Sequence, residues 1–236
     1  MKIILVRHGL TEANMSSLYS LDSTKLHKSG FNVLVNTRRA LEKYRIDKVY
    51  TSALLRSQQT AKMLGFEDFT PDARINELDF GDFKGQSFVE VRTNYKDFFK
   101  TQEKDPFNTR YPNGESRMDL INRTSEFLDE ISKKNENALC VSHGIAIKSC
   151  LFWILKDLSD WDSFWIENGA ITVFDVKSNI KLIEKVNNLW DLSTWQMLIW
   201  RIIRLLAMTL VLSLGKIPGS LLKISLRETR MQTLPL

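Results

Sequence analysis

The chain has 236 residues, of which 43% are apolar and 26% charged, and its formal net charge is +5. Residues 190–236 contain six Lys or Arg and two Asp or Glu, so they carry +4 and leave only +1 for residues 1–189. This weak charge excludes a general polyanion binder, and no nucleic acid partner is expected.

The first part of the chain alternates strands with helices. Residues 2–6 predict a buried parallel strand, because four apolar residues follow one another and three of them are Ile or Val. A helix is expected over about residues 30–44, then a short strand over 47–52. A second helix over 54–64 follows, and Gly65 ends it as a C-cap.

The rest of the chain continues the alternation. Residues 72–81 are expected to be strand or loop. Two helices are expected, over residues 87–104 and about 116–134, separated by a loop that contains two prolines. A third strand, a helix and a final hairpin are predicted over residues 137–142, 145–155, and 170–176 with 181–186, respectively.

This order of elements predicts an α/β fold, a three-layer α/β/α sandwich with a mostly parallel sheet and helices on both faces. Residues 1–189 are expected to form one domain. Residues 190–236 are an apolar, basic C-terminal extension, expected to be a helical tail.

Polar residues follow three of the predicted strands at the point where each strand ends. The strands end in Arg7-His8-Gly9, in Thr51-Ser52 with Arg56 one helical turn later, and in His143-Gly144. A doubly wound sheet brings such strand ends to one edge, where two arginines and two histidines would meet. The alternatives are two histidines satisfied in loops, and an Arg56 that pairs with Glu42 or Asp47 at the surface.

The predicted cluster suits phosphoryl transfer. Arginine forks match phosphate oxygens, and helix N-termini add N–H groups that favour an anion. A neutral histidine is a competent nucleophile near neutral pH, and a glutamic acid in the same cleft can protonate the leaving oxygen.

Six sequence blocks carry a resemblance to a known family. They are residues 5–14, 50–61, 76–85, 112–116, 141–144 and 168–171. In this order they resemble the histidine phosphatase superfamily, which has the phosphoglycerate mutase-like fold, from residue 1 to about residue 190. Leu10 and Ala53 depart from residues common in the family, which bears on substrate range more than on activity.

The resemblance implies a role for each of six residues. His8 is the implied nucleophile, and Glu77 the implied proton donor. The residues implied to hold the phosphoryl group are Arg7, Asn14, Arg56 and His143. Only the resemblance selects Glu77 from the acids nearby, which are Glu67, Asp68, Asp72, Asp79 and Asp82. Asn14 has the alternative role of capping the next turn. No metal and no cofactor are implied.

We therefore expect a phosphomonoesterase that acts on a small phosphorylated substrate. The alternatives are a cofactor-dependent phosphoglycerate mutase and a non-catalytic module that binds a phospho-ligand. The stretch between Glu77 and His143 is short for a mutase, and its scattered basic candidates are Arg92, Lys96, Lys100 and Arg110. Aromatic residues in the lid, residues 82–116, hint at an apolar leaving group or else pack beneath the lid; they are Phe88, Tyr95, Phe98, Phe99, Phe107 and Tyr111.

Location is inferred from the cysteines and the N-terminus. Cys140 and Cys150 show no metal spacing, and no signal peptide is recognised, so a cytoplasmic protein with reduced thiols is expected. In the tail, residues 195–225 combine Trp, Arg and apolar residues. They suit peripheral contact with a membrane, and docking on the main domain or self-association is an equal alternative.

Overall fold

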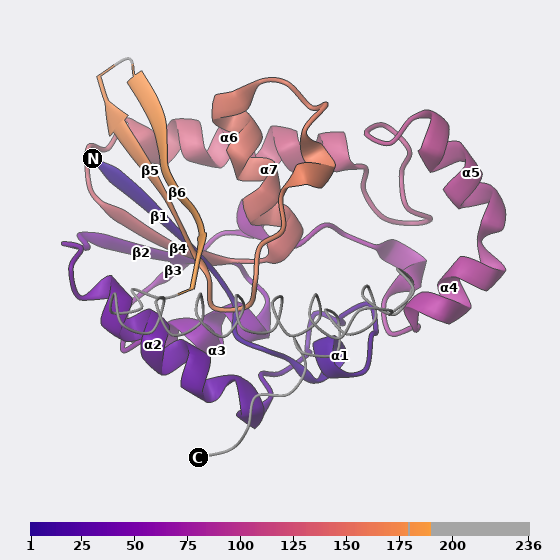
Figure 1. The fold of residues 1–236 in the computed structure, drawn as a ribbon, viewed down its shortest axis with the longest axis horizontal. Helices are drawn as coiled ribbons and strands as arrows, with labels where there is room; N and C mark the ends of the chain where they lie inside the picture. Colours follow the sequence, from indigo (N-terminus) through magenta and orange to yellow (C-terminus); the bar gives the residue numbers. More distant parts are fainter. Residues whose placement is uncertain (179, 190–236) are drawn as a thin grey trace, which may run out of the picture. The chain divides into compact units, whose positions relative to one another are not determined.

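A computed structural model describes residues 1–178 and 180–189, and within them six strands form one sheet (Figure 1). The strand order is β3-β2-β4-β1-β5-β6. The parallel strands are β1 (Lys2–Arg7), β2 (Lys48–Thr51), β3 (Thr70–Pro71) and β4 (Ala138–Ser142). The antiparallel hairpin β5 (Ile171–Lys177) and β6 (Ile180–Asn188) extends the sheet beside β1.

The sheet is covered on both faces. Along β1, Ile3 and Leu5 face one side, whereas Ile4 and Val6 face the other. All four are fully buried, which explains an unbroken apolar run instead of an alternating one. The first side packs against α6 (Arg117–Ser132) and α7 (Gly144–Leu155), and the second against α2 (Phe31–Leu41) and α3 (Leu55–Met63) (Figure 1). The predicted α/β fold is confirmed.

The lid, beyond the carboxyl ends of the parallel strands, differs from the expectation in one respect. The single helix predicted over residues 87–104 is wrong, because α4 (Phe88–Asn94) and α5 (Lys96–Lys104) are separate helices. The chain leaves the helical conformation at Tyr95 (φ −115°, ψ 42°), whose ring packs 4.6 Å from that of Phe83. This partly buried ring contact accompanies the break between the two helices.

Short elements were not predicted from the sequence. Besides β3 they are α1 (Glu12–Met15) and the 3₁₀ turns η1 (Lys28–Gly30), η2 (Ala73–Ile75), η3 (Gly81–Phe83) and η4 (Trp161–Ser163). Each spans four residues or fewer, so none has a periodic apolar pattern long enough to recognise.

Aromatic packing around Phe83 holds the lid together. Phe83 is fully buried, and five aromatic rings lie with their centroids 4.6–6.2 Å from its own: Tyr19, Tyr95, Phe98, Phe99 and Tyr111. Most of the lid aromatics therefore pack against one another. Phe88 differs, since half of it remains exposed.

Phe83→Ala is expected to lower the free energy of unfolding by about 3–5 kcal/mol, the usual cost of removing a buried phenylalanine ring. Phe88→Ala is the matched control, and its expected cost is below about 1 kcal/mol because its ring is half exposed. Urea denaturation of both variants measures the difference. Equal losses in the two variants would contradict this account of the lid.

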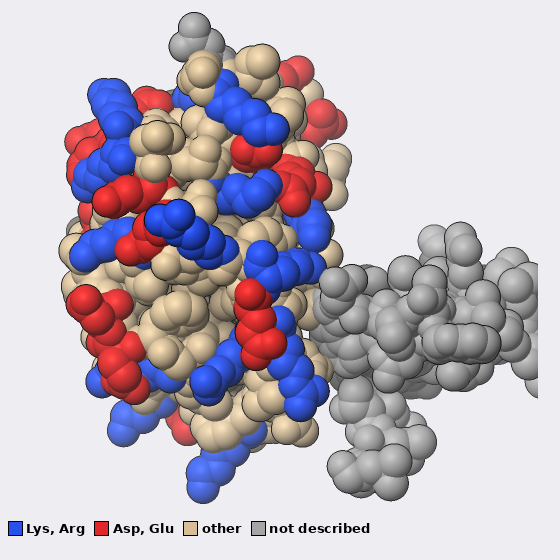
Figure 2. Space-filling view, turned by 90° about the vertical axis from the view of Figure 1, so that its left-hand side faces the viewer, with Lys and Arg blue, Asp and Glu red and all other residues tan. Residues whose placement is uncertain are grey.

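The surface carries charges of both signs. On the face at the N-terminal end of β1, Lys and Arg side chains intermingle with Asp and Glu (Figure 2). No helix in the described part of the chain is long and apolar enough to cross a membrane. The expected tail helix and the segment 195–225 lie outside the described residues.

Candidate active site

Three parallel strands end side by side. β4 lies between β1 and β2, with Arg7 opposite Ser142 and Thr51 opposite Val141. The backbone continues this pairing past the strands, since the N–H of His8 donates to Ser142 O at 2.9 Å. The strand register thus brings the residues that follow each strand to one edge of the sheet, the arrangement that the sequence predicts.

His8 is held in one tautomer. Its Nδ1 lies 2.7 Å from the carbonyl oxygen of Gly9, which can only accept a hydrogen bond, so Nδ1 carries the proton. In the neutral ring, Nε2 then keeps the free lone pair. Gly9 is anchored in turn, because its N–H donates to Thr60 Oγ1 at 3.1 Å. The ring thus presents an unprotonated nitrogen from a fixed backbone.

The surroundings of His8 keep its ring neutral. Burial lowers the pKa of His8 well below its usual value of 6.5, and the positive charges of Arg56 and Arg7 lower it further. The hydrogen bond to Gly9 O opposes this shift. A ring with a depressed pKa stays unprotonated at neutral pH, as a nitrogen nucleophile requires.

His143 faces His8 from the end of β4. The two ring centroids are 5.0 Å apart, and His143 is fully buried. The hydroxyls of Ser52 and Ser57 lie 2.7 and 3.2 Å from its Nε2, which fixes the ring. Burial and then the charge of Arg56 lower the pKa of His143 well below 6.5.

Arg7 and Arg56 supply the positive charge of the site. Arg56 is 2% exposed and donates to Leu21 O at 3.1 Å, while Arg7 donates to Ile166 O at 2.5 Å. Surface pairing of Arg56 is wrong, because its side chain is buried. Among the described residues, the buried Nε atoms of both arginines and Nδ1 of His143 have no hydrogen-bond partner. The two guanidinium Nε–H groups are therefore free to donate to a bound anion.

Asn14 and Asn168 tie the loop after β1 to the segment before β5. Asn14 caps α1, since its Oδ1 accepts from the N–H of Thr11 at 3.2 Å. Asn168 donates to His8 O at 3.0 Å, to Gly9 O at 3.2 Å and to Asn14 Oδ1 at 3.3 Å. Sequence reasoning gave Asn168 no role, although it begins one of the six blocks.

Glu77 lies against the N-terminus of α7, the helix that follows His143. Its Oε1 accepts from the N–H of Ala146 at 3.0 Å, and its Oε2 accepts from that of Ile145 at 3.3 Å. Glu77 partly offsets the lowering of the pKa that burial causes in both Arg7 and Arg56. The helix end therefore orients a carboxyl group beside the two arginines.

The nearby acids are placed differently. Asp72 pairs with Arg74 at 2.7 Å and Asp79 with Lys84 at 2.9 Å. Asp82 accepts from the side chain of Asn113 at 3.0 Å. Glu67 and Asp68 are exposed. Within the described residues, His, Cys, Asp and Glu side chains form no group of three that could hold a metal ion.

Sequence comparison relates the chain to phosphatases. The family model of the histidine phosphatase superfamily (branch 1) matches residues 3–189. Phosphoserine phosphatase 1 of Hydrogenobacter thermophilus is 28% identical over 193 residues, which cover 79% of this chain and 92% of that protein. The 6-phosphofructo-2-kinase/fructose-2,6-bisphosphatase 1 of Mus musculus is 31% identical over 160 residues, which cover 67% of this chain. The chain spans only 33% of that mouse protein's length.

Structure comparison agrees on the fold. The crystal structure of the alpha-ribazole phosphatase from Shigella flexneri superposes with a TM-score of 0.73 at 23% sequence identity. The match covers 80% of this chain and 98% of that one.

Proposed function

Because the chain belongs to the histidine phosphatase superfamily, branch 1, and is a phosphomonoesterase of that type, we propose that it hydrolyses a small phosphorylated metabolite through a phosphohistidine on His8. The observation that carries this proposal is the His8 ring itself. Its Nδ1–H donates to Gly9 O, and its pKa is lowered by burial and by the charges of two arginines. Nε2 is therefore a nucleophile with its lone pair available.

In the first half of the proposed reaction, His8 Nε2 attacks phosphorus while the bond from phosphorus to the ester oxygen breaks. The proton of the Glu77 carboxyl goes to the leaving oxygen, so an alcohol departs. The phosphoryl oxygens bind Arg7, Asn14, Arg56 and His143. Donors placed in advance stabilise charge spread over the equatorial oxygens without reorganising during the step.

In the second half, water attacks the phosphohistidine. The Glu77 carboxylate takes the proton from the water, the new bond from oxygen to phosphorus forms, and the bond from phosphorus to Nε2 breaks. Inorganic phosphate leaves, and the neutral imidazole and the protonated carboxyl are restored. The same two residues thus begin the next cycle unchanged.

Water, rather than a second metabolite, is the proposed acceptor. A mutase must bind a carboxylate-bearing phosphoglycerate with extra cations, and three of the four lid candidates have local partners. Arg92 stacks on the ring of Phe99, 4.7 Å from its centroid. Arg110 pairs with Asp119 at 2.6 Å, and Lys100 pairs with Asp97 at 3.0 Å. These contacts support hydrolysis over phosphoryl exchange between metabolites.

Two assays test the proposal. The first measures phosphate release from phosphoserine, fructose 2,6-bisphosphate and other sugar phosphates, the first two chosen from the names of the relatives. Hydrolysis without added 2,3-bisphosphoglycerate is expected, and conversion of 3- to 2-phosphoglycerate would instead indicate the mutase. The second assay mixes the enzyme with substrate that carries a labelled phosphoryl group, stops the reaction after milliseconds and measures the label on the protein. Acid-labile, alkali-stable label on His8 is expected, and its absence in an active enzyme would rule out the covalent step.

A further inference from the structure

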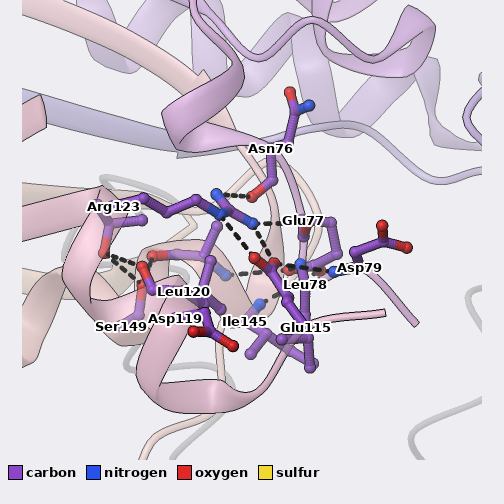
Figure 3. Close-up of polar contacts among 12 residues, drawn as sticks. Asn76, Glu77, Leu78, Asp79, Glu115, Asp119, Leu120, Arg123, Ile145 and Ser149 are labelled. Atoms are coloured by element: carbon purple, nitrogen blue, oxygen red, sulfur yellow. Dashed lines mark hydrogen bonds and ion pairs between the residues drawn. The ribbon is translucent and has the colours of Figure 1, made fainter. Parts of the chain in front are cut away.

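Arg123, in α6, binds the backbone of residues 74–77, the segment that carries Glu77. Its Nη1 donates to Arg74 O at 2.7 Å and to Asn76 O at 2.8 Å, and its Nη2 donates to Glu77 O at 2.9 Å (Figure 3). One guanidinium group therefore gathers three carbonyl oxygens of the segment 74–77.

Glu115 extends this contact to the other side of Glu77. Its carboxylate accepts from Nε of Arg123 at 3.1 Å, and also from Nη2. Its Oε1 accepts from the N–H of Asp79 at 2.9 Å, and its own N–H donates to Asp79 O at 3.0 Å. The Arg123–Glu115 pair is mostly buried, with side-chain exposures of 20% and 15%. Figure 3 shows the pair between α6 and the segment that carries Glu77.

These contacts matter because the segment between η2 and η3 is irregular. Neither a helix nor a strand pairs the carbonyls of Asn76 and Glu77, and buried carbonyls without partners are costly. A guanidinium fork is planar and preorganised, so it satisfies several carbonyls at once and fixes their relative positions. Lysine, with a single ammonium group on a flexible stem, cannot hold the same set.

We propose that Arg123, braced by Glu115, is a positioning residue that sets where the Glu77 carboxyl meets the leaving oxygen. This inference rests on the proposed function, since it assumes that Glu77 is the proton donor. Arg123 contacts the main chain of Glu77, whereas the Glu77 carboxyl bonds to α7. Arg123 therefore acts by holding the backbone in place. A shift of about 1 Å at a reacting group can cost about 100-fold in rate.

The test compares two leaving groups in the variants Arg123→Gln and Arg123→Lys. p-Nitrophenolate leaves without a proton, whereas the alkoxide of phosphoserine or a sugar phosphate needs one. The ratio kcat/KM reports steps up to phosphorylation of His8, so the later use of Glu77 as a base does not enter. We expect kcat/KM for the alkyl ester to fall by about 100-fold, and that for p-nitrophenyl phosphate by less than about threefold.

Two controls make the result interpretable. Arg74→Gln removes an arginine whose side chain pairs with Asp72 and Glu130 rather than with Glu77, so both esters should be affected equally. Glu77→Gln should show the strongest dependence on the leaving group. If kcat/KM depends on the leaving group in Glu77→Gln but not in either Arg123 variant, the positioning role is wrong and the proposed function stands. If Glu77→Gln lacks this dependence, the acid role itself fails.

Folding of each variant is measured by thermal melting. Where Arg123→Gln does not fold, Arg123→Lys and Glu115→Gln decide the matter. Glu115→Gln keeps an oxygen for Asp79 N–H but loses the charge that braces Arg123, so a selective loss of about tenfold is expected for the alkyl ester. A folded Glu115→Gln and a folded Arg123→Lys that both treat the two esters alike would overturn the proposal.

Discussion

His8→Ala is expected to abolish turnover, with kcat falling by about 10⁴-fold or more, because loss of an enzymic nucleophile removes the covalent route. The remaining arginines still bind the phosphate ester, so KM should change far less than kcat. Labelled substrate that marks wild-type protein on a histidine should leave His8→Ala unlabelled. Hydrolysis of p-nitrophenyl phosphate and rapid-quench labelling measure the two effects.

His27→Ala is the matched control for His8→Ala, since His27 is the third of the three histidines in the chain. His27 caps η1, and its Nδ1 lies 2.7 Å from Ser29 Oγ. Its replacement should therefore leave kcat within about twofold of the wild type. Equal hydrolysis by wild type and His8→Ala would instead favour a phospho-ligand-binding module with contaminating activity.

Arg56→Gln is expected to have the second largest effect, a fall in kcat/KM of about 10²–10³-fold, as when one preorganised donor to transition-state charge is lost. Arg56 also holds down the pKa of His8, after burial the largest cause of that shift. Without this charge the His8 pKa rises. The imidazole is then protonated at a higher pH, and the acid limb of the kcat/KM profile moves upward.

Arg56→Lys separates the two contributions of Arg56. A lysine keeps the positive charge, so the acid limb should stay near that of the wild type. It cannot form the bidentate hydrogen bonds of arginine to phosphate oxygens, so kcat/KM should remain low. The dependence of kcat/KM on pH is calculated with the concentration of the substrate dianion. Otherwise the ionisation of the phosphate ester would itself change kcat/KM with pH. An unchanged acid limb in Arg56→Gln would show that this arginine does not control His8.

The convergence of Arg7, Arg56 and the two histidines follows from features that the sequence displays. Alternating strands and helices imply a parallel sheet, and parallel strands bring their carboxyl ends to one edge. Charge and histidine content at those ends then indicate an anion site. The pattern of strands and helices does not identify the proton donor, because several Asp and Glu residues lie close together along residues 67–82. The family resemblance selected Glu77, and the structure adds its contact with α7.

Residues that act through main-chain atoms escaped sequence reasoning. Asn168 and Arg123 bind carbonyl oxygens of segments that lie 160 and 47 residues away in the sequence. A carbonyl is common to every residue, so the sequence of the partner segment holds no sign of the contact. The break at Tyr95 escaped for a related reason, since it accompanies the packing of its ring on Phe83, in another part of the chain.

The central pairing of β1 with β4, in which Ile3 lies opposite Ala138, has a consequence for biosynthesis. Strand partners so distant in sequence make folding slow, because a long loop must close before the contact is gained. During translation β1 emerges first, and at about 5–20 residues per second its neighbour follows roughly 7 to 30 s later. During that interval an apolar strand lacks its native partners, so the nascent chain is prone to aggregate. Chaperones present during expression should therefore raise the yield of folded protein.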